Sequence, residues 1–208
     1  MKRLMQYTLF LSLLLLGLYV FDSFMAGGRY FATISSKILA LGANPHQMVN
    51  IKVDVVADSA FSQQEVILAA VSESFEQFQA AGINFTIDSF KVHPLPMGEE
   101  QKIAPKRPGH FTVILSGNPQ TIKSDHEWLD VAGLAYPQKN LVIIALSTES
   151  LLNSARLVST LQHELAHLFY VEHDDYASSY VMSPVANSST TWSPAARAQL
   201  NKMRYRLL

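Results

Sequence analysis

The segment His163–His173, which reads HELAHLFYVEH, constrains the fold more than any other part of the chain. His163 and His167 stand four residues apart, so on a helix their imidazoles project from one face about 6 Å apart and can share one metal ion. His173 follows six residues later and reaches the same ion only if the helix ends and the chain turns back. We therefore expect a metal-binding helix face followed at once by a tight turn.

Apolar residues around this segment predict which side of the helix is buried. The helix is expected from about residue 151 to 170, with apolar side chains recurring at helical spacing. These side chains are Val158, Leu161, Leu165 and Leu168. At about 100° per residue the two histidines point away from this seam, so they are expected to face a cleft.

Glu164 follows the first histidine and would lie beside the metal rather than bind it. In that place it can take a proton from a metal-bound water. Three histidine ligands leave a fourth zinc position open for water, as in catalytic rather than structural zinc sites. Ordinary surface histidines are the alternative reading, but they do not account for these offsets together with Glu164. If His173 is not the third ligand, Glu172 and Asp174 are its nearest substitutes.

A second motif follows the histidines. Residues 180–184 read YVMSP, with Met182 nine positions beyond His173. Together the two motifs resemble the metzincin metallopeptidases, whose pattern is HExxHxxGxxH followed by a methionine-containing turn. The resemblance covers about residues 49–208 and is closest to the matrixin-like members. It implies a zinc-dependent endopeptidase with His163, His167 and His173 as ligands, Glu164 as general base and Met182 packed beneath the ligands.

The resemblance also implies how a substrate would bind. An edge strand in the segment GLAYP would hold an extended peptide by main-chain hydrogen bonds, as strand addition does. The residues of this strand are Gly133, Leu134, Ala135 and Tyr136. The residues after the Met-turn would form the wall of the pocket for the side chain that follows the scissile bond. They are Pro184, Val185 and Ala186.

Two positions depart from the family pattern. Tyr170 occupies the place of the glycine, where the turn out of the helix favours a left-handed backbone that side chains resist. The expected turn is therefore strained or differently shaped. Ala186 stands where many matrixins have a tyrosine, so the pocket wall is expected to differ.

The rest of the chain predicts the order of secondary-structure elements. Strands are expected at 51–58, 83–92, 111–115, 131–136 and 141–146, with 131–136 at an edge because Pro137 bounds it. Ser62 and Glu65 predict a capping box that opens a helix ending near Gly82, and Ser193 with Pro194 predicts the start of a last helix. Residues 93–109 are expected to be a surface loop. The predicted class is α+β, with a twisted mixed sheet, a long helix, an active-site helix, a Met-turn and a C-terminal helix.

The N-terminus predicts export. Lys2 and Arg3 precede an almost unbroken apolar run at 4–21, which fits both a signal peptide and a membrane anchor. The basic end is expected to stay in the cytoplasm, with the rest outside. We divide the chain into a signal-anchor or signal peptide at 1–28, a short helical stalk at 29–48 and a catalytic domain at 49–208.

Composition excludes several other classes. The chain has no cysteine and a net charge of −1, so thiolate ligands and disulfides are excluded, and no basic stripe indicates a nucleic-acid partner. Three acidic residues in a loop with His126 form either a calcium site or, more simply, a solvated acidic loop; they are Asp125, Glu127 and Asp130.

Two other functions remain open beside the endopeptidase. One is a binding module that keeps the metal fold without turnover, although binding zinc does not require Glu164. The other is a zinc hydrolase that does not cleave peptides. The partner expected for the leading hypothesis is a protein or peptide substrate.

Overall fold

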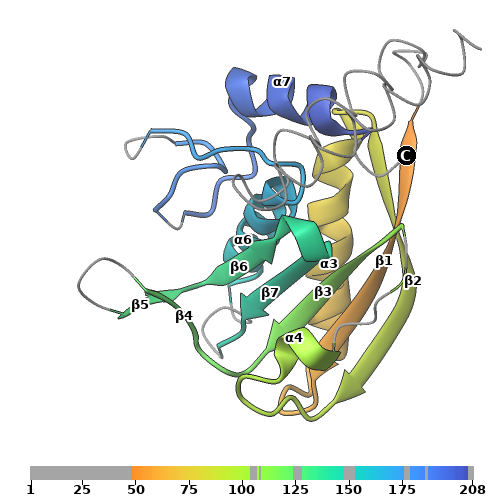
Figure 1. Ribbon diagram of the computed structural model, residues 1–208, viewed down its shortest axis with the longest axis vertical. Coiled ribbons are helices and arrows are strands. Elements are labelled where there is room, and N and C mark those ends of the chain that lie inside the picture. Colours follow the sequence, from red (N-terminus) through yellow and green to blue (C-terminus); the bar gives the residue numbers. More distant parts are fainter. Residues whose placement is uncertain are drawn as a thin grey trace, which may run out of the picture.

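The computed structural model describes residues 48–103, 107, 109–123, 128–147, 153–175, 179–185 and 187–205. Its centre is a five-stranded sheet in the order β2-β1-β3-β7-β6 (Figure 1). The five strands are β1 (Val49–Asp58), β2 (Ile83–His93), β3 (His110–Ser116), β6 (Gly133–Tyr136) and β7 (Leu141–Ala145). Strands β2, β1, β3 and β7 run parallel, and β6 is antiparallel at the edge. The predicted mixed sheet is thus confirmed, and the edge strand expected at 131–136 is shorter, at Gly133–Tyr136.

Helices complete the fold. They are α3 (Gln64–Gln79), α4 (Glu100–Ile103), the 3-10 helix η1 (Pro137–Lys139), α6 (Ser154–His167) and α7 (Pro194–Met203). The buried apolar residues of α3 and α6 belong to the same large core cluster as Val53 and Val55 of β1. A smaller cluster on the other face of the sheet includes Val56 and Ile114. The two long helices therefore cover one face of the sheet, as Figure 1 shows.

Strand β1 is buried more fully than its sequence alternation predicts. Residues alternate between buried and exposed only up to Lys52, and every residue from Val53 to Asp58 is buried. This follows because both faces of the strand are covered, with Val53 and Val55 in the main core cluster and Val56 in the smaller one. Asp54 is buried in consequence, with 1% of its surface exposed.

Helix boundaries differ from the predictions at two places. Helix α3 is capped by Gln63 without any side-chain hydrogen bond, so the capping box expected at Ser62 and Glu65 is wrong. The helix ends at Gln79, and Gly82 lies in the following turn with φ 73°. Helix α6 spans Ser154–His167 rather than 151–170, because Asn153 caps its start and residues after His167 form a turn.

Helix α7 begins as predicted. Ser193 is its N-cap, and the Ser193 hydroxyl accepts a hydrogen bond of 3.0 Å from the Ala196 N–H. Pro194 is the first helical residue. The serine satisfies one of the amide groups that a helix start leaves without an intrahelical partner.

Two segments expected to be loops carry regular structure. The segment 93–109 contains α4 and buries Leu95 and Glu100, so it is only partly a surface loop. Strands β4 (Gln120–Lys123) and β5 (Trp128–Val131) pair antiparallel, and we call this pair of strands the hairpin. This hairpin extends from the end of the sheet where β6 begins (Figure 1).

The predicted membrane segment at 4–21 lies outside the described residues, as does the predicted stalk except Met48. Within the ranges that the structure describes, no helix is both long and apolar enough to cross a membrane.

Candidate metal centre

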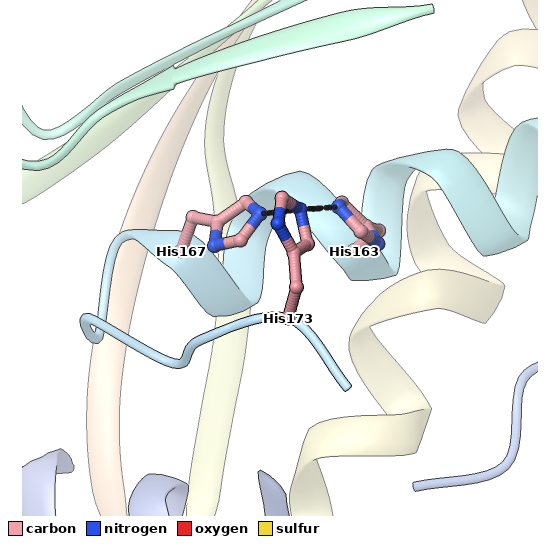
Figure 2. Close-up of side chains that lie close together, drawn as sticks. All are labelled: His163, His167 and His173. Atoms are coloured by element: carbon pink, nitrogen blue, oxygen red, sulfur yellow. Dashed lines mark hydrogen bonds between the residues drawn. The ribbon is translucent and has the colours of Figure 1, made fainter. Parts of the chain in front are cut away.

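The structure brings together the three histidines that the sequence spacing singled out. Their Nε2 atoms converge at the end of α6, and each pair of these atoms is 3.1 Å apart. Figure 2 shows His163 and His167 projecting from the helix and His173 facing them from the segment that turns back. Two nitrogens bound to a tetrahedral zinc at about 2.0–2.1 Å would be about 3.3 Å apart. The spacing therefore fits a single zinc ion.

Backbone carbonyls decide which ring nitrogens carry hydrogen. His163 Nδ1 lies 2.8 Å from the Val181 carbonyl oxygen, and His167 Nδ1 lies 2.7 Å from that of Val171. A carbonyl oxygen only accepts, so both Nδ1 atoms donate and both Nε2 atoms of the neutral rings present lone pairs. Two lone pairs facing each other at 3.1 Å repel unless a cation lies between them. The donor set thus supports a metal ion, independently of the sequence motif.

Burial keeps these ligands in the neutral form that binds metal. Removal from water lowers the pKa of His167 to about 3 and lowers the pKa of His163 and of His173 as well. The cause is that the charged imidazolium loses more hydration than the neutral ring. Near neutral pH, no ligand has to release a proton before the metal binds.

The turn after α6 has the geometry that the family glycine would favour, although the residue is Tyr170. Its φ is 57°, in the left-handed region. The Tyr170 N–H donates to His167 O at 2.9 Å, and the Val171 N–H donates to Ala166 O at 3.3 Å. These two bonds form a Schellman motif, which reverses the chain at a left-handed residue. The turn therefore has the shape expected for a glycine, and the backbone of Tyr170 is strained. It brings His173 back to the helix.

The Met-turn, at residues 180–184, makes hydrogen bonds both to helix α6 and to the segment that carries His173. Its Val181 carbonyl accepts from His163, while the Met182 carbonyl accepts a hydrogen bond of 2.9 Å from the Asp174 N–H. The Met182 side chain is fully buried in the main core. Asp174 is tied further to α7, because the Ser193 hydroxyl donates to its Oδ1 atom at 2.7 Å. The residue that follows the third histidine is thus fixed by one backbone and one side-chain hydrogen bond.

Glu164 lies on the same side of α6 as the two helical histidines and lines the same cleft. Only 8% of its surface is exposed, and burial raises the pKa of its carboxyl group to about 8 in the metal-free protein. A carboxyl group with a pKa near neutrality can both accept and release a proton. This matches the requirement for a general base that later acts as an acid.

A cleft of about 680 Å³ runs past the centre. Its walls come from α6, β6, the Met-turn and the hairpin, and they include Gly133, Leu134, Ala135, Pro184 and Val185 from the predicted substrate-binding set. A second hollow of about 420 Å³ lies on the other side of the centre, where Ala135, Tyr170 and Glu172 form part of its wall. The cleft and the hollow share His167 and His173.

Two predicted substrate-binding residues do not line the cleft. Tyr136 packs against the smaller cluster on the opposite face of the sheet, with the Lys139 ammonium 5.3 Å from the centre of its ring. Its side chain therefore cannot face a substrate at the metal centre, although its main chain belongs to the same edge strand. Ala186 lies outside the described residues.

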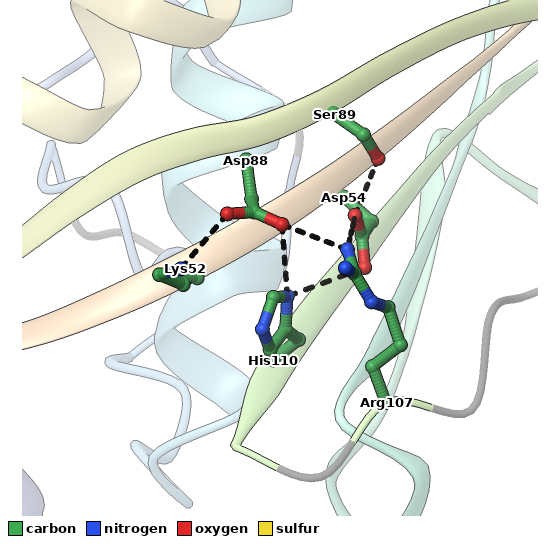
Figure 3. Close-up of polar contacts among 6 residues, drawn as sticks. All are labelled: Lys52, Asp54, Asp88, Ser89, Arg107 and His110. Atoms are coloured by element: carbon green, nitrogen blue, oxygen red, sulfur yellow. Dashed lines mark hydrogen bonds and ion pairs between the residues drawn. The ribbon is translucent and has the colours of Figure 1, made fainter.

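A second group of metal-binding residue types proves to be an ion-pair network. Asp54, Asp88 and His110 approach one another on β1, β2 and β3 (Figure 3). Arg107 Nη1, however, lies 2.9 Å from Asp54 Oδ1 and 2.7 Å from Asp88 Oδ2, and Lys52 Nζ lies 3.0 Å from Asp88 Oδ1. The acidic groups are already compensated by these side-chain cations, so we assign the cluster a structural role.

The calcium site considered at residues 125–130 receives no support. Asp130 belongs to strand β5 and pairs with Thr121 in the hairpin ladder. Residues 124–127 lie outside the described ranges.

Several residues important to the centre were missed by sequence reasoning. Val171 and Val181 act through their carbonyl groups, and no residue type marks such a role. Ser193 was recognised as a helix cap, but its bond to Asp174 joins segments that are 19 residues apart in the sequence. The one available signal was that a buried serine hydroxyl that accepts a hydrogen bond as a helix cap also needs an acceptor for its own hydrogen.

Comparisons with known proteins bear on the fold. No protein-family model matches the chain, and no curated protein sequence matches it. Among solved structures, archaemetzincin from Methanopyrus kandleri matches with a TM-score of 0.57 and 18% sequence identity, over 78% of this chain and 98% of that chain. A chaperone–substrate complex matches with a TM-score of 0.46 and 10% identity, over 74% of this chain and 34% of that chain. The first likeness shows that the chain has an archaemetzincin-like fold; the matrixin-like assignment stays a prediction.

Proposed function

We propose that this protein is a zinc-dependent metallopeptidase that cleaves within peptide chains. The observation that carries the proposal is the convergence of three histidine Nε2 atoms, with Glu164 beside them in a cleft. Backbone carbonyls hold two of these histidines, His163 and His167, in the tautomer whose Nε2 lone pair faces the centre. A binding module would need the histidines but not the buried carboxyl group. The archaemetzincin-like fold supports the same class.

Zinc held by His163, His167 and His173 would supply a Lewis acid and a water of lowered pKa. Glu164 accepts a proton from a water in the cleft and passes it to the nitrogen of the leaving amine. Its burial strengthens this role, since a poorly hydrated carboxylate is the more basic group. The carbonyls of Val181 and Val171 keep the two helical imidazoles in the tautomer that presents Nε2.

The edge strand β6 supports a peptide as the substrate. The Ala145 N–H donates to Ala132 O, so Ala132 and Ala145 form a hydrogen-bonded pair in the β6–β7 ladder. Because such pairs alternate with non-hydrogen-bonded ones, the main-chain groups of Gly133 and Ala135 point away from β7 to the open edge. An extended peptide can add to this edge by main-chain hydrogen bonds. The cleft and hollow on both sides of the centre favour cleavage within a chain.

We further propose that the catalytic domain works outside the cytoplasm, either anchored by residues 4–21 or released after cleavage of the segment 1–28. The support is the pair Lys2 and Arg3 before the apolar run. A fusion of alkaline phosphatase to the C-terminus of the full chain tests this, since that enzyme is active only after export.

The experiment that tests the activity compares the full-length protein with the Glu164→Gln variant. Both should contain one zinc per chain by elemental analysis, and only the wild type should cleave a peptide library followed by mass spectrometry. Bound zinc without any cleavage that depends on Glu164 would favour the binding module. Release of an acyl or other group from the peptides, with every peptide bond intact, would favour the non-peptidase hydrolase.

A further inference from the structure

The β4–β5 hairpin continues the edge of the sheet beyond the metal centre. Strand β5 ends at Val131 and β6 begins at Gly133, so a single residue, Ala132, separates them. Strand β4 pairs with β5 and also contacts β7, which places β4 and β7 on the same side of the β5–β6 segment. Among the described strands, none pairs along the opposite side.

The consequence is an open edge much longer than β6. From Trp128 to Tyr136 it covers about 30 Å at roughly 3.3 Å per residue, compared with about 13 Å for β6 by itself. Exposed edges of this length present unpaired amide and carbonyl groups, and a peptide chain is their natural partner.

The hairpin also forms one wall of the cleft. Ile122 of β4 and Val131 of β5 line it, opposite Pro184 and Val185 of the Met-turn segment. Ile122 is 40% exposed and Val185 is 55% exposed, so both present apolar surface to the cleft. Among the residues lining this cleft, the ionisable ones are Glu164 and the three histidines at the centre. The part of the cleft between the hairpin and the Met-turn is therefore suited to an apolar side chain.

The direction of β6 determines which part of a substrate lies there. A peptide that adds to β6 pairs more stably when it is antiparallel to the strand than when it is parallel. It then runs opposite to the Gly133–Tyr136 direction, and therefore toward the hairpin. Residues that follow the scissile bond then lie along β5, with Ile122 near the side chains about two to four positions after the cut.

We propose that the β4–β5 hairpin extends the substrate-binding edge on the side of the residues that follow the scissile bond, and that Ile122 selects apolar side chains there. This inference rests on the proposed peptidase function. The substrate class is an extended peptide with apolar residues after the cut.

The test uses peptides that share the sequence before the cut and grow one residue at a time after it, with either valine or aspartate in the added positions. The full-length wild type, Ile122→Ser and the control Val66→Ser are compared by kcat/KM. Val66 is a similarly exposed apolar residue on α3, with 38% of its surface exposed, and it is not among the residues lining the cleft.

Ile122→Ser should lose about three- to tenfold in kcat/KM on the long valine peptides and almost nothing on the shortest one. Adding residues to the peptide before the cut should change kcat/KM by the same factor in all three proteins. Equal values for Ile122→Ser and Val66→Ser on the long peptides would overturn the inference.

A binding measurement separates this inference from the activity itself. The same peptides, fluorescently labelled, are titrated onto zinc-loaded Glu164→Gln protein with and without Ile122→Ser. If wild type cleaves no peptide but the long valine peptides bind more weakly to the double variant, the proposed activity fails, while the binding of apolar side chains at Ile122 is supported. Equal binding by the two proteins refutes the inference whether or not cleavage occurs.

Discussion

Gly133 lies so close to Glu164 that a β-carbon at position 133 would be 2.7 Å from the Glu164 Cγ atom and 3.1 Å from its Cδ atom. Contacts below about 3 Å between carbon atoms are strongly repulsive. A glycine at position 133 therefore leaves room for the Glu164 side chain, which passes directly over its backbone. The Glu164 carboxyl group is held in place by packing against β6 as well as by its own helix.

Gly133→Ala should displace the Glu164 side chain while leaving the histidines in place. We expect kcat to fall about 10- to 100-fold, because a shift of about 1 Å in a catalytic group can cost this much. Zinc content, measured by elemental analysis, should stay at one ion per chain. A variant that retains full kcat would show that the carboxyl group does not depend on this contact.

The stability of the metal-free protein should depend on pH through Glu164. The pKa of its carboxyl group is about 8 in the folded protein and near 4.5 when unfolded. Between these values the folded state holds a proton that the unfolded state has released, so stability is lost as the pH rises. Below pH 6.5 the histidines act in the opposite direction, since burial lowers their pKa in the folded state.

Comparison with Glu164→Gln, which has the same histidines, isolates the contribution of the carboxyl group between pH 6.5 and 8. With zinc removed by a chelator, the wild type should lose about 2 kcal/mol of unfolding free energy across this window relative to Glu164→Gln. Urea denaturation at the two pH values measures the difference. An equal change in unfolding free energy in the two proteins would mean that the pKa of Glu164 is not raised.

The left-handed turn at Tyr170 should be a source of strain. Tyr170→Ala and Tyr170→Gly both remove the ring, which packs against the main core, but only glycine adopts φ 57° without cost. We expect both variants to be less stable than the wild type, with the glycine variant about 1 kcal/mol more stable than the alanine variant. Urea denaturation of zinc-loaded protein measures this difference, and equal stabilities would show that the backbone is relaxed.

Much of this architecture could be predicted from the sequence because it depends on local pattern. The seam of Leu161 and Leu165 sets the orientation of α6, and the His163–His167 spacing then defines the metal-binding face. The hairpin was missed because Gln120–Lys123 is short and polar and becomes a strand only by pairing with β5. The contact of Gly133 with Glu164 joins a strand to a helix, so neither segment reveals it alone.

Loss of the positive charge of Arg107 should lower the free energy of unfolding more than loss of the negative charge of Asp88, its more exposed partner. Arg107→Gln leaves the Asp54 carboxylate, which is 1% exposed, with the Ser89 hydroxyl and His110 as its remaining contacts. An incompletely compensated buried charge should cost about 1–3 kcal/mol of unfolding free energy. Asp88→Asn, at a side chain that is 23% exposed, should lower the free energy of unfolding less than Arg107→Gln does. The reverse order in urea denaturation would contradict a structural role for the Arg107–Asp54 pair.

Zinc should stabilise the folded protein only while all three histidines are present. At a free zinc concentration of 100 times the dissociation constant, the wild type should gain about 2.7 kcal/mol, which a chelator should reverse. His173→Ala removes one of the three converging Nε2 atoms, so most of this gain should be lost. His93→Ala is the matched control, because His93 lies at the end of β2 and contacts the Pro94 carbonyl instead. Thermal unfolding with and without zinc measures the gain, and an undiminished gain in His173→Ala would assign the third ligand to another residue.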